Sequence, residues 1–390
     1  MLTNKKVNIF YILHCLFDFY TGITGAIFVL LLYSYHLNEM EVNFVIGLPL
    51  LLTFMMEIPT GVFSDYIGYK KSILLSGFLL IIANVLFILG NNLYWFSLAQ
   101  IIIGLSTTFI TGTLDAWIVS TLNDSNHNHL FVKKNKYSTI IAIVAGFISG
   151  IIADKNIKLI FVFALIASLL FEWIAFKYID ALNIYHVQSK SMTDHFIDMK
   201  NIFKESLHYS IQNKALLRMF VFYGLFTFCT ASVFVYWSPV MYSFENINYF
   251  LIGFSWSLMR IFMLVGNILA DKIKDINLKT LMILTFCCGL VILTMTITNQ
   301  FYLFFMMLML FELLLGLIFP MRETLLNNII DYSNRATLLS FNSMIVSILN
   351  YISIIFMGMI SEFYSISISW FLSGSIMILL AIFCVKKETM

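Results

Sequence analysis

The chain has 390 residues, of which 60% are hydrophobic and 11% are charged, and its formal net charge is +2. A typical soluble domain is about 45–50% apolar and about 25% charged, so this composition excludes a soluble enzyme, a secreted disulfide scaffold and a disordered chain. Basic residues form no cluster typical of nucleic-acid binding, so no nucleic-acid partner is expected. The five cysteines lie in apolar runs without metal-ligand spacing, so no metal site is expected either.

Twelve apolar runs follow one another along the chain, most of them close to the roughly 20 residues that a helix needs to cross a bilayer. The first six are 8–34, 42–63, 72–90, 93–121, 137–153 and 157–179, and the last six are 215–241, 247–270, 280–298, 300–330, 336–360 and 366–385. The runs are continuously apolar and do not alternate, which disfavours a β-barrel. The sequence therefore predicts an all-α membrane protein with twelve transmembrane helices in two six-helix halves.

The longest polar stretch separates the two halves. It predicts an N-terminal half over 1–180, a linker over 181–214 with a short amphipathic helix near 195–211, and a C-terminal half over 215–390. Of the 23 Lys and Arg residues, nineteen fall on one side of the alternating topology, while only Lys155 and Lys158 fall on the other. Cytoplasmic loops carry the excess of Lys and Arg, so both termini and the linker are expected in the cytoplasm.

A glycine–acid–glycine motif lies between the second and third expected spans. It contains Gly61, Asp65 and Gly68, followed by Lys70. Gly61 allows close approach of two helices, and Gly68 permits a tight turn. Asp65 can cap a helix or pair with a cation between the halves, and Lys70 can meet anionic lipid headgroups.

This motif resembles the signature of the major facilitator superfamily, although Tyr66 and Tyr69 replace basic residues that are usual there. Residues 57–61, 112–117 and 334–340 resemble a bacterial branch that contains many drug and small-molecule exporters. The resemblance implies a multi-pass transporter of the bacterial cytoplasmic membrane that moves a small molecule by alternating access. It is expected to be a monomer and not an enzyme. No phosphate-binding lysine loop occurs, so a proton gradient rather than a cofactor is the expected energy source.

Charged residues inside the spans are functional candidates, because burying a charge in lipid is unfavourable. One group lies toward the cytoplasmic ends of the spans. Its members are expected to form an ion-paired gate, in a mainly structural role: Glu57, Asp115, Arg322 and Glu323, with Arg335 at the start of the eleventh span.

A second group lies deeper and is expected to bind substrate or carry protons. Asp18 lies about ten residues into the first span, and His14 lies one turn earlier on the same helix face. Such a pair can hand on a proton near neutral pH, or His14 can simply hydrogen-bond Asp18. Arg260 and Glu312 form either a structural or a substrate-facing pair, and Glu172 either lines a cavity or reaches toward a membrane face.

The spans contain more acids than bases, which favours a cationic or amphiphilic substrate and proton coupling. The leading prediction is proton-coupled export of such a molecule. The alternatives are an importer of a nutrient or peptide, or a non-transporting sensor or lipid-moving protein on the same fold. The antiporter motif of the fifth span is incomplete, because no proline follows Gly146 and Gly150, and this leaves the direction of transport open.

Overall fold

The computed structural model describes residues 2–110, 112–122, 128–179, 209, 212–273, 276–330 and 335–386. In this part of the chain every regular element is an α-helix. Among the described residues, twelve helical segments are long and apolar enough to cross a membrane. The predicted all-α membrane fold is therefore confirmed.

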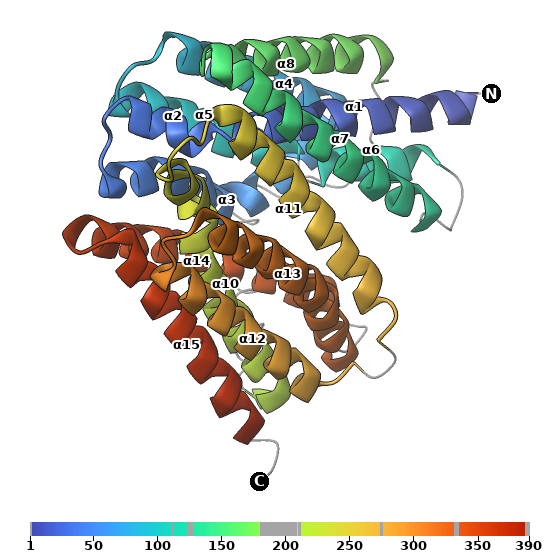
Figure 1. The fold of residues 1–390 in the computed structure, drawn as a ribbon. Coiled ribbons are helices and arrows are strands. Elements are labelled where there is room, and N and C mark those ends of the chain that lie inside the picture. The colour runs from blue at the N-terminus through green and yellow to red at the C-terminus, as the bar shows by residue number, and fades with distance from the viewer. Residues whose placement is uncertain are drawn as a thin grey trace. The chain divides into compact units, whose positions relative to one another are not determined.

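The helices fall into two compact units, coloured from blue to red along the chain in Figure 1. Unit 1 consists of Met1–Leu37, Leu48–Met199 and Asn248–Ser257, and unit 2 consists of Asn38–Gly47, Lys200–Ile247 and Leu258–Met390. The first eight helices are α1 (Leu2–Gly25), α2 (Phe28–Ser34), α3 (Glu39–Ile67), α4 (Tyr69–Leu89), α5 (Leu93–Ile110), α6 (Thr113–Thr121), α7 (Asn128–Lys155) and α8 (Leu159–Tyr178). The others are α10 (Lys214–Tyr242), α11 (Tyr249–Ala270), α12 (Leu278–Ile297), α13 (Phe301–Ile329), α14 (Arg335–Phe363) and α15 (Ile366–Lys386).

In unit 1, α1 packs on α7 and α8, and α4 packs on α5 and α8. A buried apolar cluster joins α1 to α6 and α8 through Phe10, Leu13, Trp117 and Phe171. Burial of such large side chains fixes the helices against one another, because each of these residues contacts many neighbours. The cluster holds α6 beside α1, and this arrangement positions the charged residues described below.

In unit 2, α12 packs on α13 and α15, while α10 packs on α14 and α15. The contact between α12 and α15 is close because Gly289 and Gly374 face each other. A Cβ atom on either glycine would lie 2.9 Å from the carbonyl oxygen of the other. Small residues at this crossing let the two backbones touch, as is common between membrane helices.

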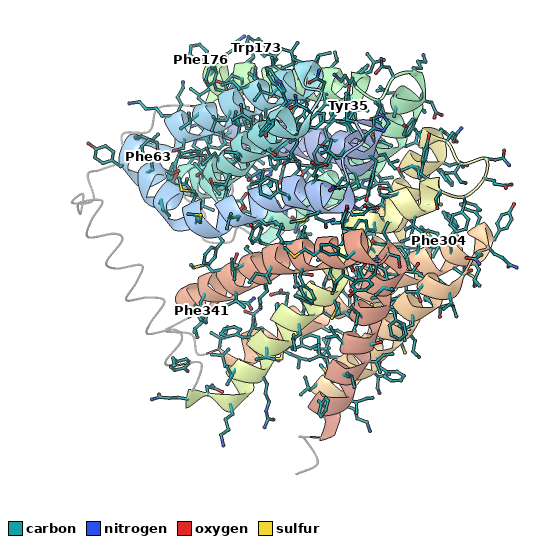
Figure 2. The ribbon with its side chains drawn as sticks, turned by 90° about the vertical axis from the view of Figure 1, so that its left-hand side faces the viewer. Tyr35, Phe63, Trp173, Phe176, Phe304 and Phe341 are labelled. Atoms are coloured by element: carbon teal, nitrogen blue, oxygen red, sulfur yellow. The ribbon has the colours of Figure 1, made fainter. Side chains whose placement is uncertain are left out.

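The outer surface of the helices carries large apolar side chains. Trp173 and Phe176 project from α8 with exposed fractions of 54% and 67% (Figure 2). In contrast, Phe304 is buried and stacks on Trp370, with the two ring planes 9° apart. Exposed aromatic rings of this kind suit a lipid environment, where contact with apolar chains is favourable.

Several helices differ from the apolar runs that predicted them. Helix α3 continues through Ser64 to Ile67, residues expected in a loop, and the turn falls at Gly68 with φ of +92°. Helix α7 begins at Asn128 rather than near 137, so Lys133 and Lys134 lie on a helix and not in a loop. Hydropathy marks the part of a helix that crosses the hydrocarbon core, whereas backbone hydrogen bonding continues beyond it.

The polar stretch between the halves is described only at its end. Residues 180–208 lie outside the described part of the chain, and with them most of the predicted linker and its amphipathic helix. Helix α10 starts at Lys214, where the Asn213 side chain accepts hydrogen bonds from the backbone N–H groups of Ala215 and Leu216, both at 3.1 Å. Asn213 is thus an N-cap that defines where the second set of spans begins.

Candidate functional site

Three helices of unit 1 meet at the carboxylate of Asp115. Asp115 lies in the first turn of α6, which begins after Gly112, a residue with φ of +78°. His14 on α1 places Nε2 3.0 Å from Oδ1 of Asp115, and Lys134 on α7 places Nζ 3.0 Å from Oδ2. One carboxylate therefore links α1 and α7 through hydrogen bonds that involve an ionised group, which are stronger than neutral ones.

The next turn of the same two helices carries a second contact. Asp18 follows His14 by four residues on α1, and Ser138 follows Lys134 by four residues on α7. The Ser138 hydroxyl donates a hydrogen bond to Oδ2 of Asp18. Residues four apart lie on one helix face, so the two contacts form successive rungs between α1 and α7. We call these five residues the α1–α7 cluster.

The prediction that His14 hydrogen-bonds Asp18 is wrong. The two side chains share a face of α1, as predicted, but the His14 ring bonds Asp115 instead. The carboxylate of Asp115 comes from the neighbouring helix α6 and accepts hydrogen bonds from both His14 and Lys134. Asp18 in turn bonds Ser138.

Aromatic rings border the α1–α7 cluster. The Phe10 ring meets the His14 ring edge-on with centroids 4.6 Å apart, and Lys134 lies 5.2 Å from the centre of the Phe131 ring. Lys133 lies 5.5 Å from the ring of Tyr11. Ring faces attract cations, so the rings beside Lys133 and Lys134 stabilise positive charge at the edge of the cluster.

Lys134 and Ser138 were not predicted as site residues. Lys134 was counted only among the positive charges that predict the orientation in the membrane, and Ser138 was not singled out. A usable signal was present in their spacing, because both pairs, His14 with Asp18 and Lys134 with Ser138, are separated by one helical turn. Hydropathy concealed this spacing, because the apolar run begins near residue 137 and Lys134 was therefore expected in a loop.

Glu172 occupies a different place, where α8 crosses α4. Its carboxylate lies against Gly77, and a Cβ atom at that glycine would collide with Oε2. That oxygen is buried and has no hydrogen-bond partner among the residues that the structure describes. Glu172 therefore lies at a contact between α4 and α8, two helices of unit 1.

In unit 2, Arg322 on α13 lies between aromatic rings. Its guanidinium carbon is 4.4 Å from the ring centre of Tyr223 on α10 and 4.5 Å from that of Phe319. Phe226 adds a third ring at 5.8 Å. Glu323, predicted as a gate residue with Arg322, approaches it with Oε1 only to 3.9 Å from Nε. We call this arrangement the Arg322 box.

Arg260 on α11 and Glu312 on α13 also come together in unit 2. The two groups are near enough to interact electrostatically, as the predicted pairing of the eighth and tenth spans requires. Glu312 is buried, with 2% of its surface exposed. A charge of opposite sign is the usual partner of a buried carboxylate, because an isolated one is strongly unfavourable.

Few contacts are described for the remaining predicted residues. Lys70, at the start of α4, lies 5.6 Å from the centre of the Phe176 ring. The side chains of Glu57, Asp65 and Arg335, and the surroundings of Gly61, lie outside the described part of the chain. In the part that is described, no group of three or more His, Cys, Asp or Glu side chains is placed to hold a metal ion.

Comparisons with known proteins agree with this architecture. The sequence profile of the Major Facilitator Superfamily matches residues 10–321. An uncharacterized MFS-type transporter, YxaM of Bacillus subtilis (strain 168), is 27% identical over 238 residues, which cover 60% of this chain. The chain spans 58% of the length of that relative.

Solved structures share the fold at low sequence identity. A POT family transporter in complex with a thioalcohol-conjugated peptide is similar with a TM-score of 0.78 and 12% identity, over 99% of this chain and 96% of the other. The nucleoside transporter NupG has a TM-score of 0.74 and 14% identity, over 98% and 97% of the two chains. The D-xylose-proton symporter has a TM-score of 0.72 and 16% identity, over 97% and 96%.

Proposed function

The chain belongs to the major facilitator superfamily, and from this premise we propose that it is a proton-coupled secondary transporter that exports a small amphiphilic or cationic molecule. Its family makes it a multi-pass membrane transporter rather than an enzyme. The proposal adds the coupling ion, the direction and the class of substrate. It also places the protein in the cytoplasmic membrane of a bacterium, as a monomer with both termini in the cytoplasm.

The observation that carries the proposal is the difference between Asp18 and Asp115. Asp115 has an ammonium group and an imidazole within 3.0 Å. Asp18 accepts from a neutral hydroxyl, and in the described part of the chain no cation lies within ion-pair distance of it. Protonation of Asp115 would break an ion pair, whereas protonation of Asp18 breaks none. Asp18 is therefore the better proton carrier of the two.

A change in the protonation of Asp18 alters the contact between α1 and α7. The ionised carboxylate accepts the hydrogen bond of Ser138, and the neutral acid carries a proton that it can donate in turn. Loss of the negative charge also removes its attraction to Lys134 and His14 one turn away. A proton shifts a conformational equilibrium only when it binds one conformation more tightly than the other. A conformation in which α1 and α7 make this contact would bind the proton differently from one in which they do not.

The proposed class of substrate is supported by the charge of Asp18. Asp18 is an acid in a membrane-spanning helix, and in the described part of the chain no cation lies within ion-pair distance of it, so it can attract a cationic compound. Aromatic residues are abundant, at 16% of the chain, and can supply faces that bind a cation. Import of a nutrient or peptide is the principal rival to export.

The test is transport by the purified protein in liposomes, with an imposed pH gradient and a panel of fluorescent cationic compounds. We expect the wild type to move at least one compound against its gradient, and a protonophore to stop it. Asp18→Asn should reduce gradient-driven flux by about 100-fold, the lower end of what a positioned proton-transfer group contributes. Glu245→Gln, which removes an exposed acid from the loop after α10, is the matched control and should leave flux unchanged.

Each part of the proposal can fail separately. Full gradient-driven flux in Asp18→Asn would reject Asp18 as the proton carrier. Flux in the same direction as the proton would reject export and support import. Absence of flux for every compound would reject a cationic substrate, and peptides and nucleosides would be the next panel.

A further inference from the structure

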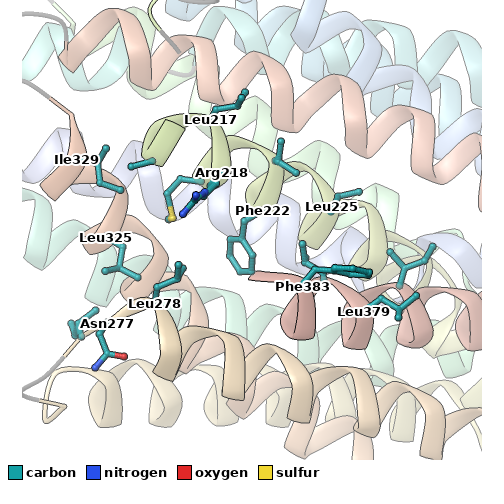
Figure 3. Close-up of a pocket in the computed structure, with 16 residues that line it drawn as sticks. Leu217, Arg218, Phe222, Leu225, Asn277, Leu278, Leu325, Ile329, Leu379 and Phe383 are labelled. Atoms are coloured by element: carbon teal, nitrogen blue, oxygen red, sulfur yellow. The ribbon is translucent and has the colours of Figure 1, made fainter. Parts of the chain in front are cut away.

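We propose that unit 2 binds the acyl chain and phosphate headgroup of an anionic phospholipid in a pocket between α10, α12, α13 and α15. The pocket has a volume of about 1070 Å³ and is shown in Figure 3. Sites for small molecules usually enclose about 300–1,000 Å³, so this pocket is large enough for a bulky apolar ligand. Its lining residues belong to unit 2, whereas the residues proposed above for proton coupling belong to unit 1.

The walls of the pocket are apolar over about two helical turns. Leu217, Val221 and Leu225 are four residues apart on α10, line the pocket and are exposed. Leu379 and Phe383 on α15 are spaced in the same way and are also exposed. Eight residues of α-helix span about 12 Å, so α10 presents a continuous apolar wall of that length. An extended acyl chain matches both the length and the chemistry of such a wall.

One charged side chain belongs to the described lining, and it is Arg218 near the start of α10. Arg218 is exposed, and no hydrogen bond or ion pair occupies its guanidinium among the residues that the structure describes. The other polar lining residue, Asn277, already accepts a hydrogen bond from the backbone of Thr280 at 2.9 Å. Arg218 is therefore available to a ligand, and a guanidinium binds phosphate oxygens through two parallel N–H groups.

The surroundings favour a lipid over a soluble anion. The helices that form the pocket cross the membrane, so an acyl chain can enter it from the bilayer without passing through water. The starts of α10 and α12 bear the exposed residues Lys214 and Lys279, which add positive charge at the same end as Arg218. Basic residues between transmembrane helices on the cytoplasmic side are typical of sites for anionic headgroups.

The test is native mass spectrometry of the full-length protein in a non-ionic detergent, after addition of phosphatidylglycerol and phosphatidylethanolamine in equal amounts. We expect the wild type to retain phosphatidylglycerol in preference. Arg218→Gln should lower that retention about five-fold, the factor for one basic residue near an anionic lipid. Leu225→Trp, which fills the pocket from an exposed position, should lower retention of phosphatidylglycerol further.

Two matched variants in unit 1 control for general effects. Lys177→Gln removes an exposed cation from the end of α8, and Leu169→Trp enlarges an exposed leucine of the same helix. Both should retain phosphatidylglycerol as the wild type does, and size-exclusion profiles report whether each variant is folded. Equal retention of the two lipids by the wild type, or unchanged retention in Arg218→Gln, would overturn the proposal. So would equal losses in the unit 1 controls.

Discussion

In unit 1, Asp115 has a lysine and a histidine from two other helices within 3.0 Å, whereas in unit 2 Arg322 has its guanidinium between two aromatic rings about 4.5 Å away. The first arrangement stabilises charge by ion pairs and hydrogen bonds, which depend on direction and on the charge of each partner. The second stabilises charge by ring faces, which tolerate small displacements. A proton can therefore change the contacts of the α1–α7 cluster, while the Arg322 box responds mainly to changes in packing.

The largest effect is expected from Lys134→Met. It removes the ammonium group from Asp115 and leaves a half-buried carboxylate with one partner, which should lower the free energy of unfolding by about 2 kcal/mol. Thermal unfolding followed by tryptophan fluorescence measures the change. Lys133→Met is the control, because the described contacts of that residue are with ring faces. The double variant Lys134→Met with Asp115→Asn should recover most of the loss, and failure to recover would contradict an ion pair.

A smaller effect is expected from Arg322→Lys. The lysine keeps the charge but loses the flat guanidinium that lies against Tyr223 and Phe319, which should destabilise unit 2 by about 1 kcal/mol. Tyr223→Leu removes one ring, and a double-mutant cycle with Arg322→Lys measures the coupling between them. Strictly additive effects would show that the ring does not stabilise the cation. Tyr223→Phe keeps the ring and serves as the control.

The smallest effect is expected from His14→Gln. Glutamine retains an N–H donor for Asp115, so the free energy of unfolding should fall by only about 0.5 kcal/mol, while His14→Leu should lower it by about 1 kcal/mol. The same unfolding assay distinguishes them. Equal losses for the two variants would mean that packing on Phe10, and not the hydrogen bond to Asp115, is what His14 contributes.

Sequence patterns predicted the twelve spans because hydropathy is a local property that each run carries by itself. The partners of the buried charges depend instead on which helices are neighbours. His14 and Asp18 were correctly assigned to one face of α1, yet their partners Asp115 and Ser138 lie far away in the sequence. The location of Glu172 depends on Gly77, and nothing in the spacing of those two residues indicates that they meet. Arg322 was assigned to an acid, and Glu323 does approach it to 3.9 Å, but the rings of Tyr223 and Phe319 that flank its guanidinium were not predicted.

The contact of Gly289 with Gly374 has a consequence for the pocket of unit 2. On α12 the pocket begins at Leu278, eleven residues or about 16 Å from the contact, whereas on α15 its lining runs from Ile376, beside the contact, to Phe383. The contact at the crossing therefore sets how far apart the ends of α12 and α15 that line the pocket can lie. A methyl group added at Gly289 would collide with the carbonyl oxygen of Gly374. The two helices would then have to move apart at their crossing, and the pocket between their ends would change in width.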